Sequence, residues 1–120
     1  MFESNGGYGL QIYKPVDATN LVGSFLFTNC YWENNTDYAI HVSGESTQRP
    51  VYITFEHPHI NSSANKAINI VQGTSININN PYFDGSPNTS GFFTVGIDIT
   101  AVGLKGYEGA IGITGLLVSG

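Results

Sequence analysis

The nine residues 24–32, SFLFTNCYW, decide the architecture, because their pattern returns at 52–60 as YITFEHPHI and at 75–83 as SININNPYF. In each copy, apolar residues stand two positions apart, a short polar corner follows, and the unit closes with apolar or aromatic residues. Alternation with a period of two is typical of a strand with one buried face. The stretch therefore predicts a strand, a tight corner and a second strand, repeated along the chain.

A second motif lies between these copies and recurs with near-constant spacing. A small residue is followed by an aliphatic, a polar and another aliphatic residue, and the copies begin at Gly9, Ala39, Ala67, Gly96 and Ala110. The starting positions are separated by 30, 28, 29 and 14 residues. A coil that closes once per repeat keeps such a spacing, because each strand stacks on its equivalent from the turn before. We therefore expect an all-β parallel solenoid of about four to five turns over residues 1–103, with a turn or transition segment at 104–120.

The repeat also predicts the core as columns of equivalent side chains. The expected interior columns are Leu10, Ile40, Ile68 and Ile97; Ile12, Val42, Ile70 and Ile99; Phe25, Ile53 and Ile76; and Phe27, Phe55 and Ile78. Equivalent side chains lie about 4.8 Å apart in such a stack, so like charges would repel. Only 11% of the residues are charged, and asparagine occurs twelve times. This composition suits stacked columns, because amide, hydroxyl and aliphatic side chains tolerate an identical neighbour.

Composition and motifs exclude several classes of function. The formal net charge of −5 argues against nucleic-acid binding, and the apolar runs are far shorter than the roughly 20 residues of a membrane span. Cys30 alone supports neither a disulfide framework nor a cysteine zinc site, and His57 and His59 lack a third metal ligand. No nucleotide or phosphate motif is present, so neither a cofactor nor a metal is expected. No signal peptide is visible, and the abrupt glycine-rich start predicts a fragment of a longer protein.

Residues 27–35, FTNCYWENN, followed by YAIHV at 38–42, resemble a rung of the right-handed parallel β-helix of pectate-lyase-like proteins. Within that family, the asparagine-rich texture and the opening GGYGLQI at 6–12 are most similar to a bacteriophage tailspike. The resemblance implies a right-handed parallel β-helix, a homotrimer, a place on the virion tail, and a bacterial surface polysaccharide that is bound or cleaved. A secreted pectate-lyase-like enzyme is the alternative.

Enzymes of this family cleave glycosidic bonds with paired carboxylates, or act as lyases with basic residues and calcium. Glu33 and Asp84 occupy equivalent positions two turns apart in this chain. That separation is about 9.6 Å between backbones, near the upper end for an inverting glycosidase pair. Glu56, after a strand, is a third catalytic candidate. The alternative for all three is an ordinary carboxylate at a turn or a strand edge, and a fragment of this size is not expected to be active alone.

The residues between the paired aliphatics predict a binding surface. They are expected to point outward as a ladder suited to sugar hydroxyls or to a second chain, and they are Gln11, His41, Asn69 and Asp98. Adjacent aromatic residues at the corners place one ring inside and one outside, and we predict Trp32 and Tyr82 as ligand-binding residues. A merely hydrated sheet face, and rings that only close the corners, are the alternatives.

The sequence also leads to expectations about the assembly of the chain and about three classes of function. The stretch Ala110–Val118 is apolar and nearly uncharged, so it is expected to be buried between chains of a homotrimer. The first function class is a tailspike or tail-fibre segment that attaches to bacterial surface polysaccharide. The second is a structural stalk or trimerisation segment without a ligand. A third is part of a polysaccharide depolymerase, either a glycoside hydrolase or a lyase.

Overall fold

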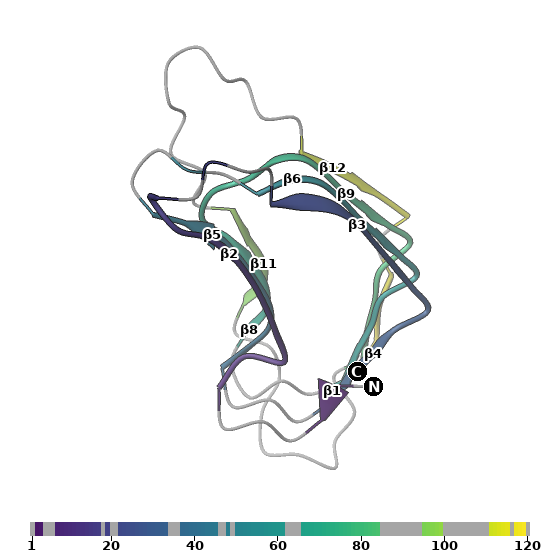
Figure 1. The fold of residues 1–120 in the computed structure, drawn as a ribbon. Helices are drawn as coiled ribbons and strands as arrows, with labels where there is room; N and C mark the ends of the chain where they lie inside the picture. Colours follow the sequence, from purple (N-terminus) through teal and green to yellow (C-terminus); the bar gives the residue numbers. More distant parts are fainter. Residues whose placement is uncertain are drawn as a thin grey trace.

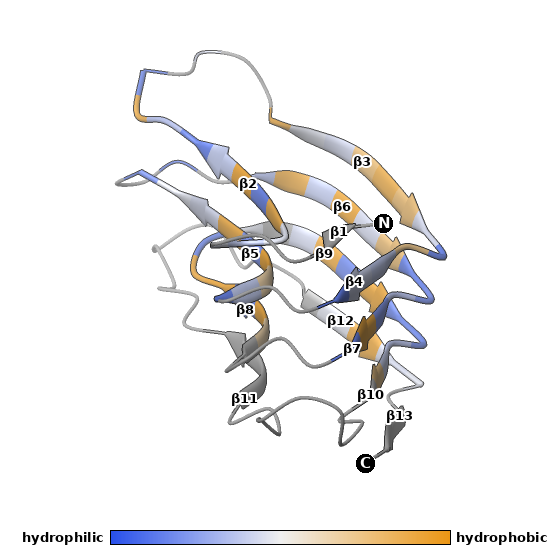
Figure 2. Ribbon diagram, turned by 90° about the horizontal axis from the view of Figure 1, so that it is seen from below, coloured by the Kyte–Doolittle hydropathy of each residue, from blue (hydrophilic) through white to orange (hydrophobic). Residues whose placement is uncertain are grey.

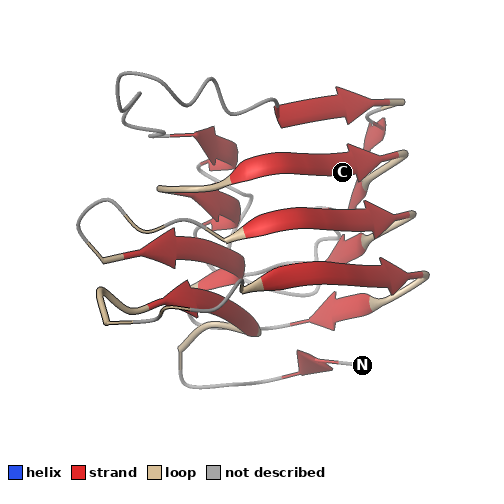
Figure 3. Ribbon diagram, turned by 45° about the horizontal axis from the view of Figure 1, so that its top comes forward, coloured by secondary structure: helices blue, strands red, loops and turns tan. Residues whose placement is uncertain are grey.

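The structure is a computed structural model that describes residues 2–3, 7–17, 19, 22–33, 37–45, 48, 50–61, 66–84, 95–99, 111–115 and 117–119. These residues form strands joined by short turns, and no helix occurs among them (Figure 3). The described part of the chain accordingly holds no helix long and apolar enough to span a membrane. The expectation of an all-β chain is confirmed.

The described strands form three parallel sheets in which each strand pairs with the one three places along the chain (Figure 1). Sheet A has, in order, β1 (Phe2–Glu3), β4 (Tyr31–Glu33), β7 (His59–Asn61), β10 (Tyr82–Asp84) and β13 (Leu117–Ser119). Sheet B has β11 (Val95–Ile99), β8 (Lys66–Ile70), β5 (Tyr38–Gly44) and β2 (Leu10–Lys14). Sheet C has β12 (Ile111–Thr114), β9 (Thr74–Asn79), β6 (Val51–Glu56) and β3 (Gly23–Thr28).

The register of the sheets agrees with the predicted columns. In sheet B, Ile68 pairs with Ile40 on one side and Ile97 on the other. In sheet C, Ile53 pairs with Phe25 and with Ile76. Both sets of equivalences that the repeat predicts are therefore confirmed, because a parallel stack brings residues of equal repeat position side by side.

The motif that begins at Ala110 belongs to a different column from the one expected. Ile111 and Ile113 pair with Ile76 and Ile78 of β9, so they continue sheet C and not sheet B. The interval of 14 residues is short because the motif lies on the next strand of the same repeat. β13 then pairs with β10 in sheet A, so the two strands described within 104–120 pair with strands of the same chain.

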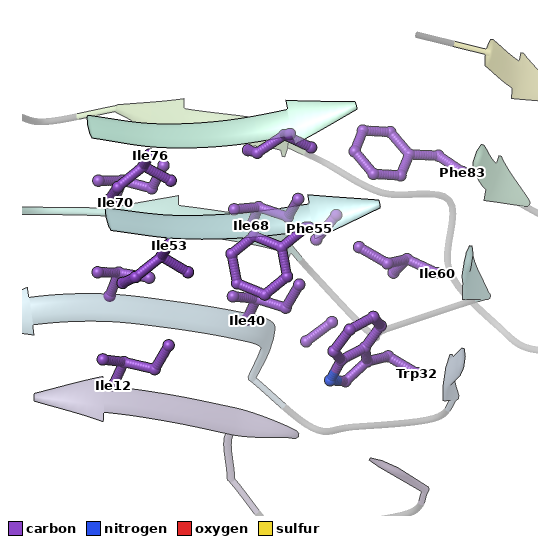
Figure 4. Packing of buried hydrophobic residues seen from close by; sticks show 14 residues of the cluster. Ile12, Trp32, Ile40, Ile53, Phe55, Ile60, Ile68, Ile70, Ile76 and Phe83 are labelled. Carbon is purple, nitrogen blue, oxygen red and sulfur yellow. The ribbon is translucent and has the colours of Figure 1, made fainter. Parts of the chain in front are cut away.

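An apolar core lies between the three sheets. Figure 4 shows the inward side chains of β5, β6, β8 and β9 stacked in rows, with Trp32, Ile60 and Phe83 reaching in from sheet A. The rings of Phe27 and Phe55 stack with centroids 5.1 Å apart, and Trp32 meets Phe55 edge-on at 6.2 Å. Removal of these apolar surfaces from water is the main stabilising contribution to the fold.

Two corners of each repeat require a left-handed backbone. Between sheets C and A, φ is positive at Asn29 (52°), His57 (51°), Asn80 (50°) and Gly115 (63°). The backbone N–H groups of the first three donate to the carbonyl groups of Glu56, Asn79 and Thr114 at 2.7–2.8 Å. Asparagine and glycine adopt this conformation at low cost, so the polar corner between the strands follows directly from the sequence. At the start of the sheet C strands, φ is positive at Ser24, Tyr52 and Ser75.

The β3 edge of sheet C leaves apolar side chains in contact with solvent. Among the described strands, β3 pairs only with β6, and Figure 2 shows the apolar part of β3 at this end of the stack. Phe25 is 41% exposed although its partner Ile53 is fully buried. Position in the stack therefore decides whether an inward residue is buried.

Candidate functional site

The outer face of sheet A carries the most complete set of side chains for ligand binding. Each of its strands β4, β7 and β10 has three residues, and the middle one points into the core: Trp32, Ile60 and Phe83 are at most 2% exposed. Because side chains alternate along a strand, the flanking residues Tyr31, Glu33, His59, Asn61 and Tyr82 point outward. The outer face therefore consists of two parallel columns, one led by Tyr31 and the other by Glu33.

The first column is a stack of rings. The ring of Tyr31 meets that of His59 edge-on, with centroids 4.6 Å apart and an interplanar angle of 72°. His59 in turn lies 4.7 Å from Tyr82, with the rings tilted by 52°. All three side chains are partly exposed. Rings arranged in this way present a continuous apolar strip with polar groups at its margin.

The second column is polar and acidic. The register aligns Glu33 with Asn61, and Asn61 with Asp84. The predicted pair Glu33 and Asp84 therefore lies two strands apart in one sheet, which corresponds to about 9.6 Å between backbones. Asn61 lies between them, and its amide Nδ2 donates to the hydroxyl of Tyr31 at 2.9 Å, which links the two columns.

Glu56, the third predicted catalytic residue, lies apart from this pair. It belongs to a column on sheet C, where its register partners are Thr28 and Asn79. The amide of Asn79 donates to the Glu56 carboxylate at 2.5 Å, and the hydroxyl of Thr114 donates to Asn79 at 3.1 Å. A carboxylate held in such a hydrogen-bonded ladder is accounted for by the stacking of the strands.

The predicted ligand ladder on sheet B is largely covered. Gln11 is exposed, but the ring of Tyr8 stacks on that of His41 with centroids 4.4 Å apart and an angle of 6°. Asn69 is only 4% exposed, against the expectation that it faces solvent, and its side chain hydrogen-bonds His41. The backbone of Asp98 pairs with Asn69 as predicted, and its side chain lies outside the described residues.

Burial changes the acid–base behaviour of His41. Loss of hydration lowers the pKa of its imidazole, and the hydrogen bond with Asn69 and the charge of Asp37 oppose this effect only in part. Nδ1 of His41 is buried, and no group of the described residues hydrogen-bonds it. This rung of the ladder is therefore part of the packing of sheet B.

The prediction that Trp32 binds a ligand is wrong. Its side chain is fully buried in the core, so the ring is not accessible to a ligand, whereas Tyr82 lies on the outer face as expected. The reason is the left-handed corner at Asn29, which sets the direction of the alternation in β4. Either of two adjacent aromatic residues can face the core, so the sequence alone could not predict which of Tyr31 and Trp32 is accessible.

Three residues of the outer face were not among the predicted site residues: Tyr31, His59 and Asn61. Their positions relative to the corners could have indicated them. Tyr31 lies two residues after the corner residue Asn29, and His59 and Asn61 lie two and four residues after the corner residue His57. His57 itself is exposed at the corner, away from the ring column. Within the described ranges, no three histidine, cysteine or acidic side chains gather as metal ligands.

Comparison with known proteins finds no matching family model and no curated protein or solved structure with significant similarity to this chain.

Proposed function

We propose that this chain is a segment of a right-handed parallel β-helix that binds bacterial surface polysaccharide through the outer face of sheet A. The pairing of every strand with the one three places along the chain supports the β-helix, because a coil of three strands per turn produces that order. The resemblance of residues 27–42 to a tailspike rung supports attachment of a phage tail to its host as the role of such binding.

The observation that carries this proposal is the column of Tyr31, His59 and Tyr82 beside Glu33 and Asn61. Aromatic rings provide apolar area with little loss of conformational entropy. The tyrosine hydroxyls and the histidine ring nitrogens add polar groups at the ring edges. The apolar faces of sugar rings pack on such a strip, while carboxylate and amide groups bind sugar hydroxyls. A column that continues over several strands suits a polymer better than a single small molecule.

The experiment is a binding measurement on immobilised bacterial polysaccharides with the full 120-residue chain. Tyr31→Ala removes a ring from the column, and Tyr13→Ala is the matched control, because Tyr13 is a 44% exposed tyrosine on β2 of sheet B. We expect Tyr31→Ala to weaken binding at least tenfold, the size of loss typical for a central aromatic contact. Thermal unfolding of both variants shows whether the fold is kept.

Equal binding by Tyr31→Ala and the parent chain would show that sheet A is not the binding face. Absence of binding to every polysaccharide would contradict the proposal and favour the structural stalk. Release of new reducing ends during the same incubation would indicate hydrolysis. In that case, Glu33→Gln is expected to abolish it, since Glu33 is the described member of the carboxylate pair.

A homotrimer is a second part of the proposal, and it is supported by the apolar surface of sheet C. Leu26 is 66% exposed and Tyr52 is 61% exposed, and they lie on the neighbouring strands β3 and β6. Large apolar side chains gathered on one surface favour contact between chains. Light scattering is expected to give about three times 12.9 kDa, and Leu26→Lys is expected to lower this mass. A monomer at high concentration would contradict the trimer and leave the glycan site untouched.

A further inference from the structure

We infer that the outer face of sheet A selects an uncharged polysaccharide and discriminates against one that carries uronate groups. The inference rests on the proposed function, since it concerns the ligand of the same site. It follows from the charged residues that the described strands of sheet A carry and from the reach of Glu33 beside the ring column.

The described strands of sheet A contain acidic residues and neither lysine nor arginine. Their acidic residues are Glu3, Glu33 and Asp84, and the register pairs Glu3 directly with Glu33. The four basic residues of the sequence are Lys14 and Lys66, on strands of sheet B, and Arg49 and Lys105, which lie outside the described residues. Sheet A therefore brings no guanidinium or ammonium group of its own to pair with a carboxylate of a ligand.

The acidic column lies within reach of any sugar bound to the rings. Tyr31 and Glu33 are two positions apart on one strand, which is about 6.6 Å along the backbone. Asn61 bridges the columns through its hydrogen bond to the Tyr31 hydroxyl. A sugar ring packed on Tyr31 or His59 thus has the side chains of Glu33 and Asn61 within reach of its substituents.

The nature of those substituents decides whether binding is favourable. A hydroxyl group donates a hydrogen bond to the Glu33 carboxylate, which is a charge-assisted and therefore strong interaction. A uronate carboxylate offers no proton, so it faces Glu33 with the same charge and loses part of its hydration. His59 is the only histidine, lysine or arginine of the described sheet A strands, and its ring lies between those of Tyr31 and Tyr82.

The test uses pairs of polysaccharides that differ only in charge. Each uronate-containing bacterial polysaccharide is immobilised beside its carboxyl-reduced form, in which every uronate has become the neutral hexose. Neutral polysaccharides are included on the same surface. We expect the full chain to bind the reduced member of a pair at least tenfold more tightly than the acidic member at low ionic strength.

Substitution of one carboxylate then tests whether Glu33 causes the preference for the reduced polysaccharide. Glu33→Gln keeps the shape and the ability to accept a hydrogen bond but removes the charge, so the preference for the reduced form is expected to fall at least threefold. Asp17→Asn is the matched control, because it removes one negative charge from an exposed residue after β2. The control is expected to keep the preference of the parent chain.

Each outcome separates this inference from the proposed function. Binding of the acidic and reduced forms with equal strength, or preference for the acidic form, would overturn the inference while glycan binding by sheet A stands. An equal effect of Glu33→Gln and Asp17→Asn would attribute the preference to net charge and overturn the role of this face. Failure to bind any acidic, reduced or neutral polysaccharide would overturn both.

Discussion

At the scale of single residues, His41 shows how neighbours change the role of a residue in a repeat. In the sequence it is one of four equivalent polar positions. In the structure the ring of Tyr8 covers it and the side chain of Asn69 hydrogen-bonds it, so it contributes to packing. Gln11, one strand away, is exposed. Equivalent positions of a repeat are therefore not equivalent in accessibility.

The stability of the fold is expected to fall on acidification through His41. Its pKa is lowered by burial in the folded state, so below about pH 6.5 the unfolded chain binds a proton that the folded chain does not. Stability is then full above that pH and decreases as the pH falls toward the lower folded pKa. Urea unfolding between about pH 8 and about pH 5.5 measures this decrease, which His41→Gln is expected to reduce. An identical decrease in both proteins would contradict the assignment to His41.

At the scale of structural elements, the corners between sheets C and A determine how the strands of sheet A are presented. At the corners before β4, β7 and β10, one residue has a positive φ, and the third residue after it is buried in the core. Asn29 and Asn80 suit this backbone, because a short amide side chain hydrogen-bonds the local backbone readily, whereas the imidazole of His57 is bulkier. The same corner that builds the ring column is therefore strained in one of its copies.

Replacement of His57 by asparagine is expected to stabilise the protein by about 0.5–1 kcal/mol in a urea titration, because asparagine tolerates a positive φ better than histidine does.

Gly115→Ala is the opposite change, since a Cβ at that position would approach Oδ1 of Asn80 and φ is 63°. We expect the alanine variant to lose stability in the same urea titration. A loss of stability in His57→Asn would show that the imidazole makes a compensating contact.

At the scale of the whole molecule, the stack is strongest in its middle and weakest at its edges. Strands β6 and β8 have a neighbour on each side, whereas β3 pairs on one side only within the described strands. In a repeat architecture, each unit is stabilised mainly by its direct neighbours. The inward side chains of β3 consequently remain partly exposed.

Two phenylalanine substitutions are expected to measure this difference. Phe55→Ala, in the fully buried centre, should reduce the free energy of unfolding by about 3–5 kcal/mol. Phe25→Ala, at a side chain that is 41% exposed, should cost about 1 kcal/mol, since it leaves a smaller cavity. Chemical denaturation of both variants compares the two values. A similar loss at both positions would indicate that β3 is covered in solution by another chain.

Periodicity alone determined the larger part of the architecture. The spacing of alternating aliphatic residues predicts parallel stacking and identifies the columns of Ile40, Ile68 and Ile53, because a residue's neighbours in a stack are its own repeats. The register also confirms that Glu33 and Asp84 lie two strands apart in one sheet. These properties depend on distance along the chain, which the sequence contains in full.

Tertiary structure decided which side of each strand is accessible and which copy is covered. The choice of Tyr31 over Trp32 on the outer face depends on the backbone conformation at the preceding corner, and two neighbouring aromatic residues carry no preference of their own. Asn69 is buried and hydrogen-bonds His41 of the neighbouring strand, although the repeat places it on the outward side. The motif at Ala110 belongs to sheet C because of the strand it meets, Thr74–Asn79. In the last two cases the deciding contact joins residues far apart in the chain, and a local pattern contains no information on such contacts.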